Sequence, residues 1–286
     1  MMSKISDYIE LMKPRLIPLL LFVAIASMVV AKGEALGIRP LLEMSILGFI
    51  GLGGSAALNN YFDRDIDSKM DRTSGRPIPS GRVPPRNALL FGLALIGVSI
   101  VFTAILLNPL TAFIIGLGAF LYVWFYTLKL KRNTPSAVVW GGLAGSIPAL
   151  GGWAAVSKTG WLTPLFIFLV VFFWQPSHFW SLALLMKQDY GRAGVPVLPV
   201  LEGEGKVVSN AILYNLLVLP FTYLLYITGG LHPFYLYSIT VLNLFLIVFS
   251  VVAYFVKRRN VYRSNYRFSL AYMFMFLLAL IVGKLV

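Results

Sequence analysis

Residues 87–128, NALLFGLALIGVSIVFTAILLNPLTAFIIGLGAFLYVWFYTL, contain no Asp, Glu, Lys or Arg over 42 positions. A helix needs roughly 20 apolar residues to span a bilayer, so this segment is long enough for two spans. Asn108-Pro109 interrupts it near the middle, where a turn between two helices is expected. A second uncharged segment, residues 207–256, is interrupted in the same way by Gly229-Gly230-Leu231-His232-Pro233. The two segments therefore predict two pairs of membrane-spanning helices.

The other uncharged segments predict five more spans, and the composition agrees with a membrane protein. Of the 286 residues, 58% are hydrophobic and 12% are charged, whereas soluble domains carry about 25% charged residues. The absence of cysteine excludes disulfides, thiolate zinc sites and iron–sulfur clusters. We predict an all-α integral membrane protein with a single domain over residues 1–286. The nine predicted spans are residues 16–32, 42–62, 87–107, 109–128, 135–156, 161–186, 208–228, 233–256 and 267–285.

Lysine and arginine are distributed unevenly over the predicted loops. Twenty of the 24 fall in one set of alternate loops, and only Lys32, Arg39, Lys158 and Lys284 fall in the other. Because cytoplasmic loops carry the excess of positive charge, the amino terminus is predicted inside and the carboxyl terminus outside. This topology accounts for the net charge of +13, so no nucleic-acid partner is expected.

The amino-terminal sequence shows no cleavable signal or transit peptide. Residues 3–14 instead predict a short amphipathic helix at the membrane surface, with Ile5, Ile9 and Met12 on one side. These features favour a multi-pass protein in the lipid bilayer of a prokaryotic plasma membrane.

Most acidic side chains fall into two groups on the predicted inner side, after spans two and six. The members are Asp63, Asp65, Asp67 and Asp71 in the first group, and Asp189, Glu202 and Glu204 in the second. Asn59, Asp63 and Asp67 are four residues apart, which places them on one face of a helix. Asp65 points away from this face and is expected to pair with Lys69.

The stripe formed by Asn59, Asp63 and Asp67 predicts a metal site. An Asp in a spanning helix costs about 2.5–3.5 kcal/mol, and stacked carboxylates repel one another unless a cation lies among them. Amide and carboxylate oxygens suit Mg²⁺. The alternative is that these side chains lie at a solvated helix end and bind no metal.

Basic residues suited to phosphate lie on the same predicted side of the membrane. They are Arg72, Arg76, Arg82, Lys131 and Arg132. Positive-inside topology alone explains some of them, but together with the acidic stripe they predict a site for a magnesium-bound diphosphate.

The stripe and the following segment Arg76-Pro77-Ile78-Pro79-Ser80-Gly81-Arg82 resemble the UbiA superfamily of intramembrane prenyltransferases. Residues 131–135 and Gly141-Gly142 look like the same superfamily. Two further segments, 175–184 (QPSHFWSLAL) and 189–200 (DYGRAGVPVLPV), are similar to the members that attach a farnesyl group to heme. The likeness covers about residues 8–270.

The resemblance implies nine helices around a central cavity that opens to the cytoplasmic side. It also implies that a farnesyl group moves from farnesyl diphosphate to a vinyl group of protoheme IX (heme B), giving heme O. Mg²⁺ is expected on Asn59, Asp63 and Asp67, and a heme A synthase or terminal oxidase could take the product. The catalytic residues implied are Asp63, Asp67, His178 and Asp189. The implied substrate-binding residues are Arg72, Arg76, Arg82, Tyr126, Lys131, Arg132, Phe179, Trp180 and Arg192.

The second acidic group departs from the superfamily pattern, because Gln188 precedes Asp189 where further acids are usual. This departure argues against a full second Mg²⁺ site. His178 is interpreted as a contact to the heme iron or a proton donor, the alternative being a structural role, and His232 as a turn residue.

Other classes of membrane protein share parts of this pattern. A relative that prenylates an aromatic quinone precursor or a glycerol-phosphate lipid would share the metal stripe and differ only in segment 175–200. A cation transporter would place its ionisable groups near the bilayer midplane, whereas the acids here lie near the inner face. A heme-binding electron carrier would need paired axial ligands, whereas the two histidines of this chain are predicted on opposite sides of the membrane. A phosphoalcohol transferase would need an Asp-Gly…Ala-Arg signature, which the sequence lacks.

Overall fold

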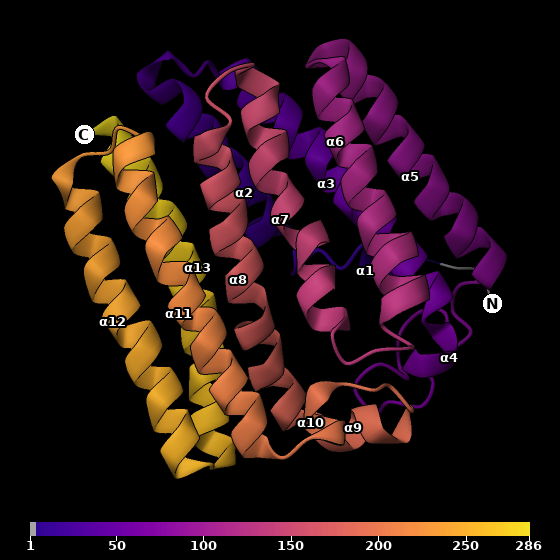
Figure 1. Cartoon of the computed structure of the whole chain (residues 1–286). Coiled ribbons are helices and arrows are strands. Elements are labelled where there is room, and N and C mark those ends of the chain that lie inside the picture. Colours follow the sequence, from indigo (N-terminus) through magenta and orange to yellow (C-terminus); the bar gives the residue numbers. More distant parts are fainter. Residues whose placement is uncertain (1–3) are drawn as a thin grey trace.

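The computed structural model describes residues 4–286, and within that range the chain is helical and contains no strand. Long helices run side by side in a bundle, as Figure 1 shows. The elements in chain order are α1 (Ile5–Leu11), α2 (Ile17–Lys32), η1 (Gly33–Ala35), α3 (Ile38–Phe62), α4 (Arg64–Asp67), α5 (Pro85–Leu106), α6 (Pro109–Phe120), η2 (Leu121–Leu130), α7 (Ala137–Val156), α8 (Leu162–Leu185), α9 (Lys187–Arg192), α10 (Leu198–Leu201), α11 (Glu204–Thr228), α12 (Pro233–Val256) and α13 (Arg259–Leu285). The predicted all-α class is confirmed.

Both predicted helical pairs are present, and each break has a physical cause. Between α5 and α6, the Asn108 side chain accepts a hydrogen bond from the Thr111 backbone N–H at 2.9 Å, and Pro109 occupies the first turn of α6. Between α11 and α12, Gly230 has a φ of +57°, a backbone conformation that favours glycine. His232 caps α12 there, as expected of a turn residue.

Within residues 4–286, eight helical segments are long and apolar enough to cross a membrane. They are Ile17–Ala35, Ile38–Phe62, Pro85–Leu106, Pro109–Leu130, Leu162–Leu185, Glu204–Thr228, Pro233–Val256 and Arg259–Leu285. Helix α7 has 20 residues and lies within the bundle, but it is not one of the eight. Its glycines, serine and proline lower its mean hydropathy, so the count of nine spans stays a prediction.

The outward faces of these helices are apolar and their contacts with one another use small and polar residues. Ile105, Ile227 and Phe255 are 70%, 74% and 76% exposed, which is favourable in lipid and unfavourable in water. A Cβ on Gly152 of α7 would lie 2.1 Å from the Ala24 carbonyl oxygen of α2, so only glycine permits this approach. Small residues at helix crossings are typical of membrane bundles.

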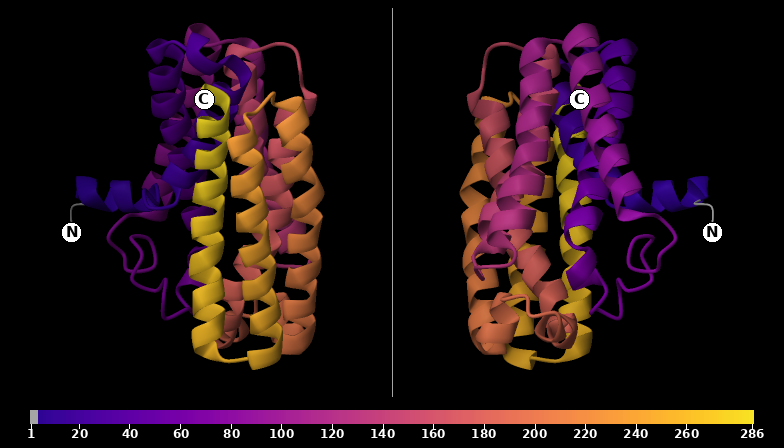
Figure 2. Two further views of the ribbon diagram at one scale, coloured as in Figure 1. Left: turned by 90° about the vertical axis from the view of Figure 1, so that its left-hand side faces the viewer. Right: turned by 90° about the vertical axis from the view of Figure 1, so that its right-hand side faces the viewer.

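The connecting segments that carry the acidic residues gather at one end of the bundle. Figure 1 shows α4, α9 and α10 together at that end, with the carboxyl terminus at the opposite end. Helix α1 projects sideways from the bundle (Figure 2) and exposes Ile5 and Ile9 while Leu11 is buried. This orientation agrees with the amphipathic surface helix predicted from residues 3–14.

Candidate active site

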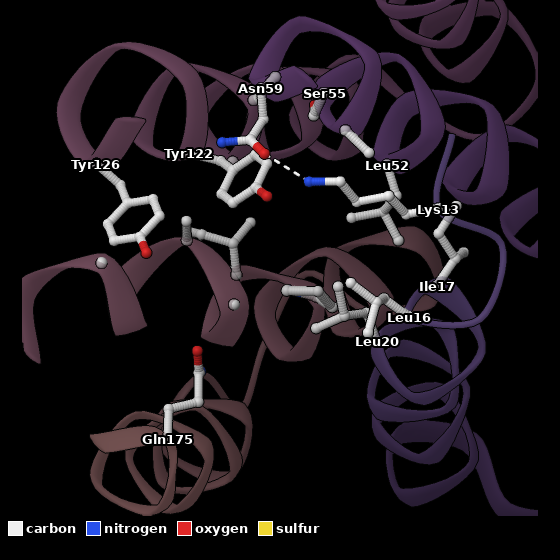
Figure 3. Close-up of a pocket in the computed structure, with 18 of the residues that line it drawn as sticks. Lys13, Leu16, Ile17, Leu20, Leu52, Ser55, Asn59, Tyr122, Tyr126 and Gln175 are labelled. Carbon is white, nitrogen blue, oxygen red and sulfur yellow. Dashed lines mark hydrogen bonds between the residues drawn. The ribbon is translucent and has the colours of Figure 1, made fainter. Parts of the chain in front are cut away.

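A cavity of about 490 Å³ lies between α2, α3, α6, η2, α7 and α8, within the size range usual for small-molecule sites. Most of its wall is apolar, with Leu16, which precedes α2, and Leu20 of α2 facing Leu52 of α3 (Figure 3). Charged and amide side chains gather where α3 gives way to α4. Those lining the cavity there are Lys13, Asn59, Asp63, Asp67, Arg72, Arg76 and Lys131.

The stripe of Asn59, Asp63 and Asp67 is buried on one face, with exposed fractions of 3%, 0% and 2%. Although α3 ends at Phe62, the helical hydrogen bonds continue across the junction with α4. The Asp63 N–H donates to the Asn59 carbonyl at 2.9 Å and the Asp67 N–H to the Asp63 carbonyl at 2.8 Å. Residues four apart therefore still lie on one helical face beyond the end of α3.

Each member of the stripe is bonded to a different basic side chain. Lys131 Nζ donates to Asp63 Oδ2 at 2.6 Å, and Arg76 Nη1 donates to Asp67 Oδ2 at 2.6 Å. Lys13 Nζ donates to Asn59 Oδ1 at 2.5 Å (Figure 3). The Asn59 amide N–H donates a further hydrogen bond to Asp63 Oδ2 at 2.7 Å. Three basic groups thus surround the carboxylates inside the cavity.

One fully buried carboxylate oxygen of the stripe has no donor. Asp63 Oδ1 is buried without a hydrogen-bond partner among residues 4–286, and the guanidinium of Arg132 is 4.0 Å from it. A buried anionic oxygen without a partner is costly, so a bound cation would stabilise it. In the described part of the chain no three His, Cys, Asp or Glu side chains cluster as metal ligands. The donor set fits Mg²⁺ with two carboxylates, one amide and further oxygens from water or phosphate.

A π-helical turn brings aromatic side chains and Lys131 to the same wall. In η2 the bonds join residues five apart: the Lys131 N–H donates to the Tyr126 carbonyl at 2.9 Å. Tyr122, Tyr126 and Lys131 consequently all line the cavity. In a regular α-helix, with about 100° per residue, Tyr122 and Lys131 would lie on opposite sides.

Five residues expected at the site do not line the cavity: Arg82, Arg132, Trp180, Asp189 and Arg192. Arg132 forms two hydrogen bonds of 2.7 Å with the Asp65 carboxylate. The guanidinium lowers the pKa of Asp65 to about 2 against the opposing effect of partial burial. The expected pairing of Asp65 with Lys69 is therefore wrong, because Arg132 from a distant segment offers a planar, bidentate partner.

The other residues of this set are engaged elsewhere. Arg82 bonds to Asp7 and Glu10 of α1 and so ties that helix to the 72–84 loop. Arg192 bridges Asp71 and Asp189, which joins the two acidic loops to each other. Trp180 is buried and packs edge-on against Tyr214, with ring centroids 5.3 Å apart.

His178 and Phe179 of α8 do line the cavity. The His178 ring lies between the rings of Trp174 and Tyr266, at centroid distances of 4.7 and 4.8 Å. Together with Tyr126 and the polar cluster, nine of the expected site residues therefore share one cavity.

Sequence reasoning missed Lys13, Tyr122, Gln175, Tyr190 and Tyr266, which also line the cavity. Lys13 has a φ of +54°, a conformation that costs a non-glycine residue about 1–3 kcal/mol. Burial, together with repulsion from Arg76 and Lys131, lowers the pKa of Lys13 to about 7. In the sequence Lys13 looks like any basic residue before a first span, and no signal distinguishes it from exposed Arg15.

The sequence profile of the UbiA prenyltransferase family matches residues 19–279, so the chain belongs to this family. It is 40% identical over 287 residues to the protoheme IX farnesyltransferase of Synechocystis sp., covering 98% of this chain and 89% of that protein.

Solved structures show the same fold. Digeranylgeranylglyceryl phosphate synthase superposes with a TM-score of 0.81 at 21% identity, covering 98% of both chains. A UbiA homolog from Archaeoglobus fulgidus, bound to DMAPP and Mg²⁺, superposes with a TM-score of 0.68 at 17% identity, covering 96% of this chain and 99% of that one.

Asp63→Asn keeps the size of the side chain and removes its charge, and the charge is what a metal ion requires. We expect prenyl transfer to fall by at least about 100-fold. Asp65→Asn should change transfer little, because that carboxylate forms only a partly exposed ion pair. Steady-state rates at saturating Mg²⁺ test both variants, and equal losses would refute the assignment of the helical face.

Proposed function

We propose that this protein transfers the farnesyl group of farnesyl diphosphate to a vinyl group of heme B, in a Mg²⁺-dependent reaction that gives heme O. The observation that carries the choice of acceptor is the 40% identity to protoheme IX farnesyltransferase over nearly the whole chain. The fold alone leaves the acceptor open, because digeranylgeranylglyceryl phosphate synthase has the same fold at 21% identity.

The polar end of the cavity would bind the diphosphate. Asn59, Asp63 and Asp67 would hold Mg²⁺, which neutralises diphosphate charge and assists its departure. The A. fulgidus homolog, which has the same fold, was solved with DMAPP and Mg²⁺. Arg76 and Lys131 already face the stripe, so little reorganisation is needed for them to bind phosphate oxygens as charge develops there.

The apolar part of the cavity would hold the farnesyl chain and exclude water from the reacting carbon. The bond between farnesyl C1 and the diphosphate oxygen breaks, and its electron pair leaves with the diphosphate. Tyr122, Tyr126 and Phe179 line this space, and aromatic π faces can stabilise an allylic cation. Attack by the vinyl group, addition of water and loss of one proton then give the hydroxyethylfarnesyl substituent.

We further propose nine spans with the amino terminus in the cytoplasm of a prokaryote, so that the polar end of the cavity opens to that side. Twenty of the 24 Lys and Arg residues support this orientation. Helix α7 would be the ninth span, since it packs closely on α2 through Gly152. A heme A synthase or terminal oxidase that receives heme O would complete the pathway.

Purified protein supplied with Mg²⁺, farnesyl diphosphate and heme B should form heme O, detected by mass spectrometry of extracted pigment. Chelation of Mg²⁺ should abolish the product. The proposal fails if the protein leaves heme unchanged and instead prenylates 4-hydroxybenzoate or a glycerol phosphate.

Lys13 should act as a third cation for the diphosphate, because it lies in the same cluster, where it donates a hydrogen bond to Asn59, and a bound anion favours its protonated form. Lys13→Met removes a charged hydrogen bond worth about 1.5–3 kcal/mol, so we expect the KM for farnesyl diphosphate to rise about 10-fold or more. Lys257→Met is the matched control, because Lys257 also has a positive φ, of 46°, but is exposed. A KM that changes equally in both variants would contradict this role.

The chain lacks cysteine, so single cysteines can report topology without background. Ser68→Cys, Ser209→Cys and Asn260→Cys should react with a membrane-impermeant thiol reagent only after the inner side is made accessible. Thr159→Cys should react from outside in intact cells. A reversed label at Thr159 would refute the nine-span arrangement.

A further inference from the structure

The His178 side chain is held in one orientation by its neighbours. It stacks between Trp174, one turn earlier on α8, and Tyr266 on α13, with interplanar angles of 17° and 23°. The Trp174 indole N–H donates to the Ser269 carbonyl at 3.0 Å, which fastens α8 to α13 beside the histidine. These contacts leave the edge of the imidazole as the part that can interact with a ligand.

One ring nitrogen of His178, Nδ1, already has a hydrogen-bond partner. Nδ1 lies 2.5 Å from Ser269 Oγ, and the Ser269 hydroxyl donates its hydrogen to the Tyr266 carbonyl at 2.9 Å. A hydroxyl has a single hydrogen, so with that hydrogen on the Tyr266 carbonyl, Ser269 accepts from the histidine. Nδ1 therefore carries the proton in the neutral ring.

The other ring nitrogen, Nε2, then carries the lone pair. Within residues 4–286 the one side-chain hydrogen bond of His178 is that of Nδ1 with Ser269, which leaves Nε2 unbonded, and His178 and Tyr266 both line the cavity. A neutral imidazole that donates from Nδ1 and offers Nε2 is the arrangement usual for a metal-binding histidine.

We propose that His178 binds the iron of the heme acceptor through Nε2, and that Ser269 is the positioning residue that fixes the required tautomer. This inference rests on the proposed function and decides between the two roles considered for His178. With Nδ1–H committed to Ser269 and no proton on Nε2, His178 orients the heme and does not act as a proton donor. The iron contact would anchor the macrocycle on the α8–α13 wall of the cavity.

The test is the visible absorption and electron paramagnetic resonance spectrum of ferric heme B added to the purified full-length protein in detergent. The wild type should show the spectrum of a histidine-ligated heme. His178→Ala should lose that spectrum, and added imidazole should restore it. Ser269→Ala should weaken heme binding about 10- to 100-fold, whereas Ser269→Thr should retain most of the affinity because it keeps the hydroxyl.

Two controls separate ligation from damage to the fold. His232→Ala removes the other histidine, which caps α12, and should leave the spectrum unchanged. Binding of inorganic diphosphate with Mg²⁺ should be unchanged in the His178 and Ser269 variants, because neither residue contacts the acidic stripe.

The inference is overturned if His178→Ala keeps the wild-type heme spectrum, if Ser269→Ala binds heme like the wild type, or if the wild type shows no histidine ligation. These results are separate from those that decide the proposed function. Formation of heme O without a spectrum that depends on His178 refutes the inference alone. A spectrum that depends on His178 without formation of heme O refutes the proposed function and leaves the heme site standing.

Discussion

The rest of the site must stabilise two buried carboxylates at the end of an apolar helix. Asp63 and Asp67 are at most 2% exposed, and ionised groups are stable away from water only when cations and hydrogen-bond donors surround them. Three distant parts of the chain supply those cations. The loop after α4 brings Arg76, the end of η2 brings Lys131, and the α1–α2 connection brings Lys13 in a strained backbone conformation. The folding of these connecting segments onto the bundle follows from this requirement.

The two acidic groups of the chain have different roles in the structure. The first group faces the cavity, whereas Asp189 is paired with Arg192, which also bonds Asp71 of the first loop. Arg192 therefore ties the second loop to the first, and Asp189 does not line the cavity. Helix α8 contributes instead through His178, held by α13 on the wall of the cavity. The proposed diphosphate and acceptor sites thus lie on different walls of one cavity.

The sequence by itself determined the helical membrane architecture and one face of the site. Uncharged segments such as 87–128 can satisfy their backbone polar groups in lipid only as helices, so composition and length were sufficient to locate them. The breaks at Asn108 and His232 followed from local turn chemistry. Asn59, Asp63 and Asp67 were placed correctly on one face because a helical hydrogen-bond pattern, which depends on neighbours along the chain, continues through all three.

Only the tertiary structure decided which partners those side chains have. Arg132 pairs with Asp65, and Lys13 reaches Asn59, because segments far apart in sequence meet there, and no local periodicity encodes such a meeting. Tyr122 and Lys131 share a wall because η2 is wound as a π-helix, whereas the α-helical period assumed from sequence places them on opposite sides. Local hydrogen bonding can be predicted from residue spacing, but the pairing of buried charges depends on the packing of the whole bundle.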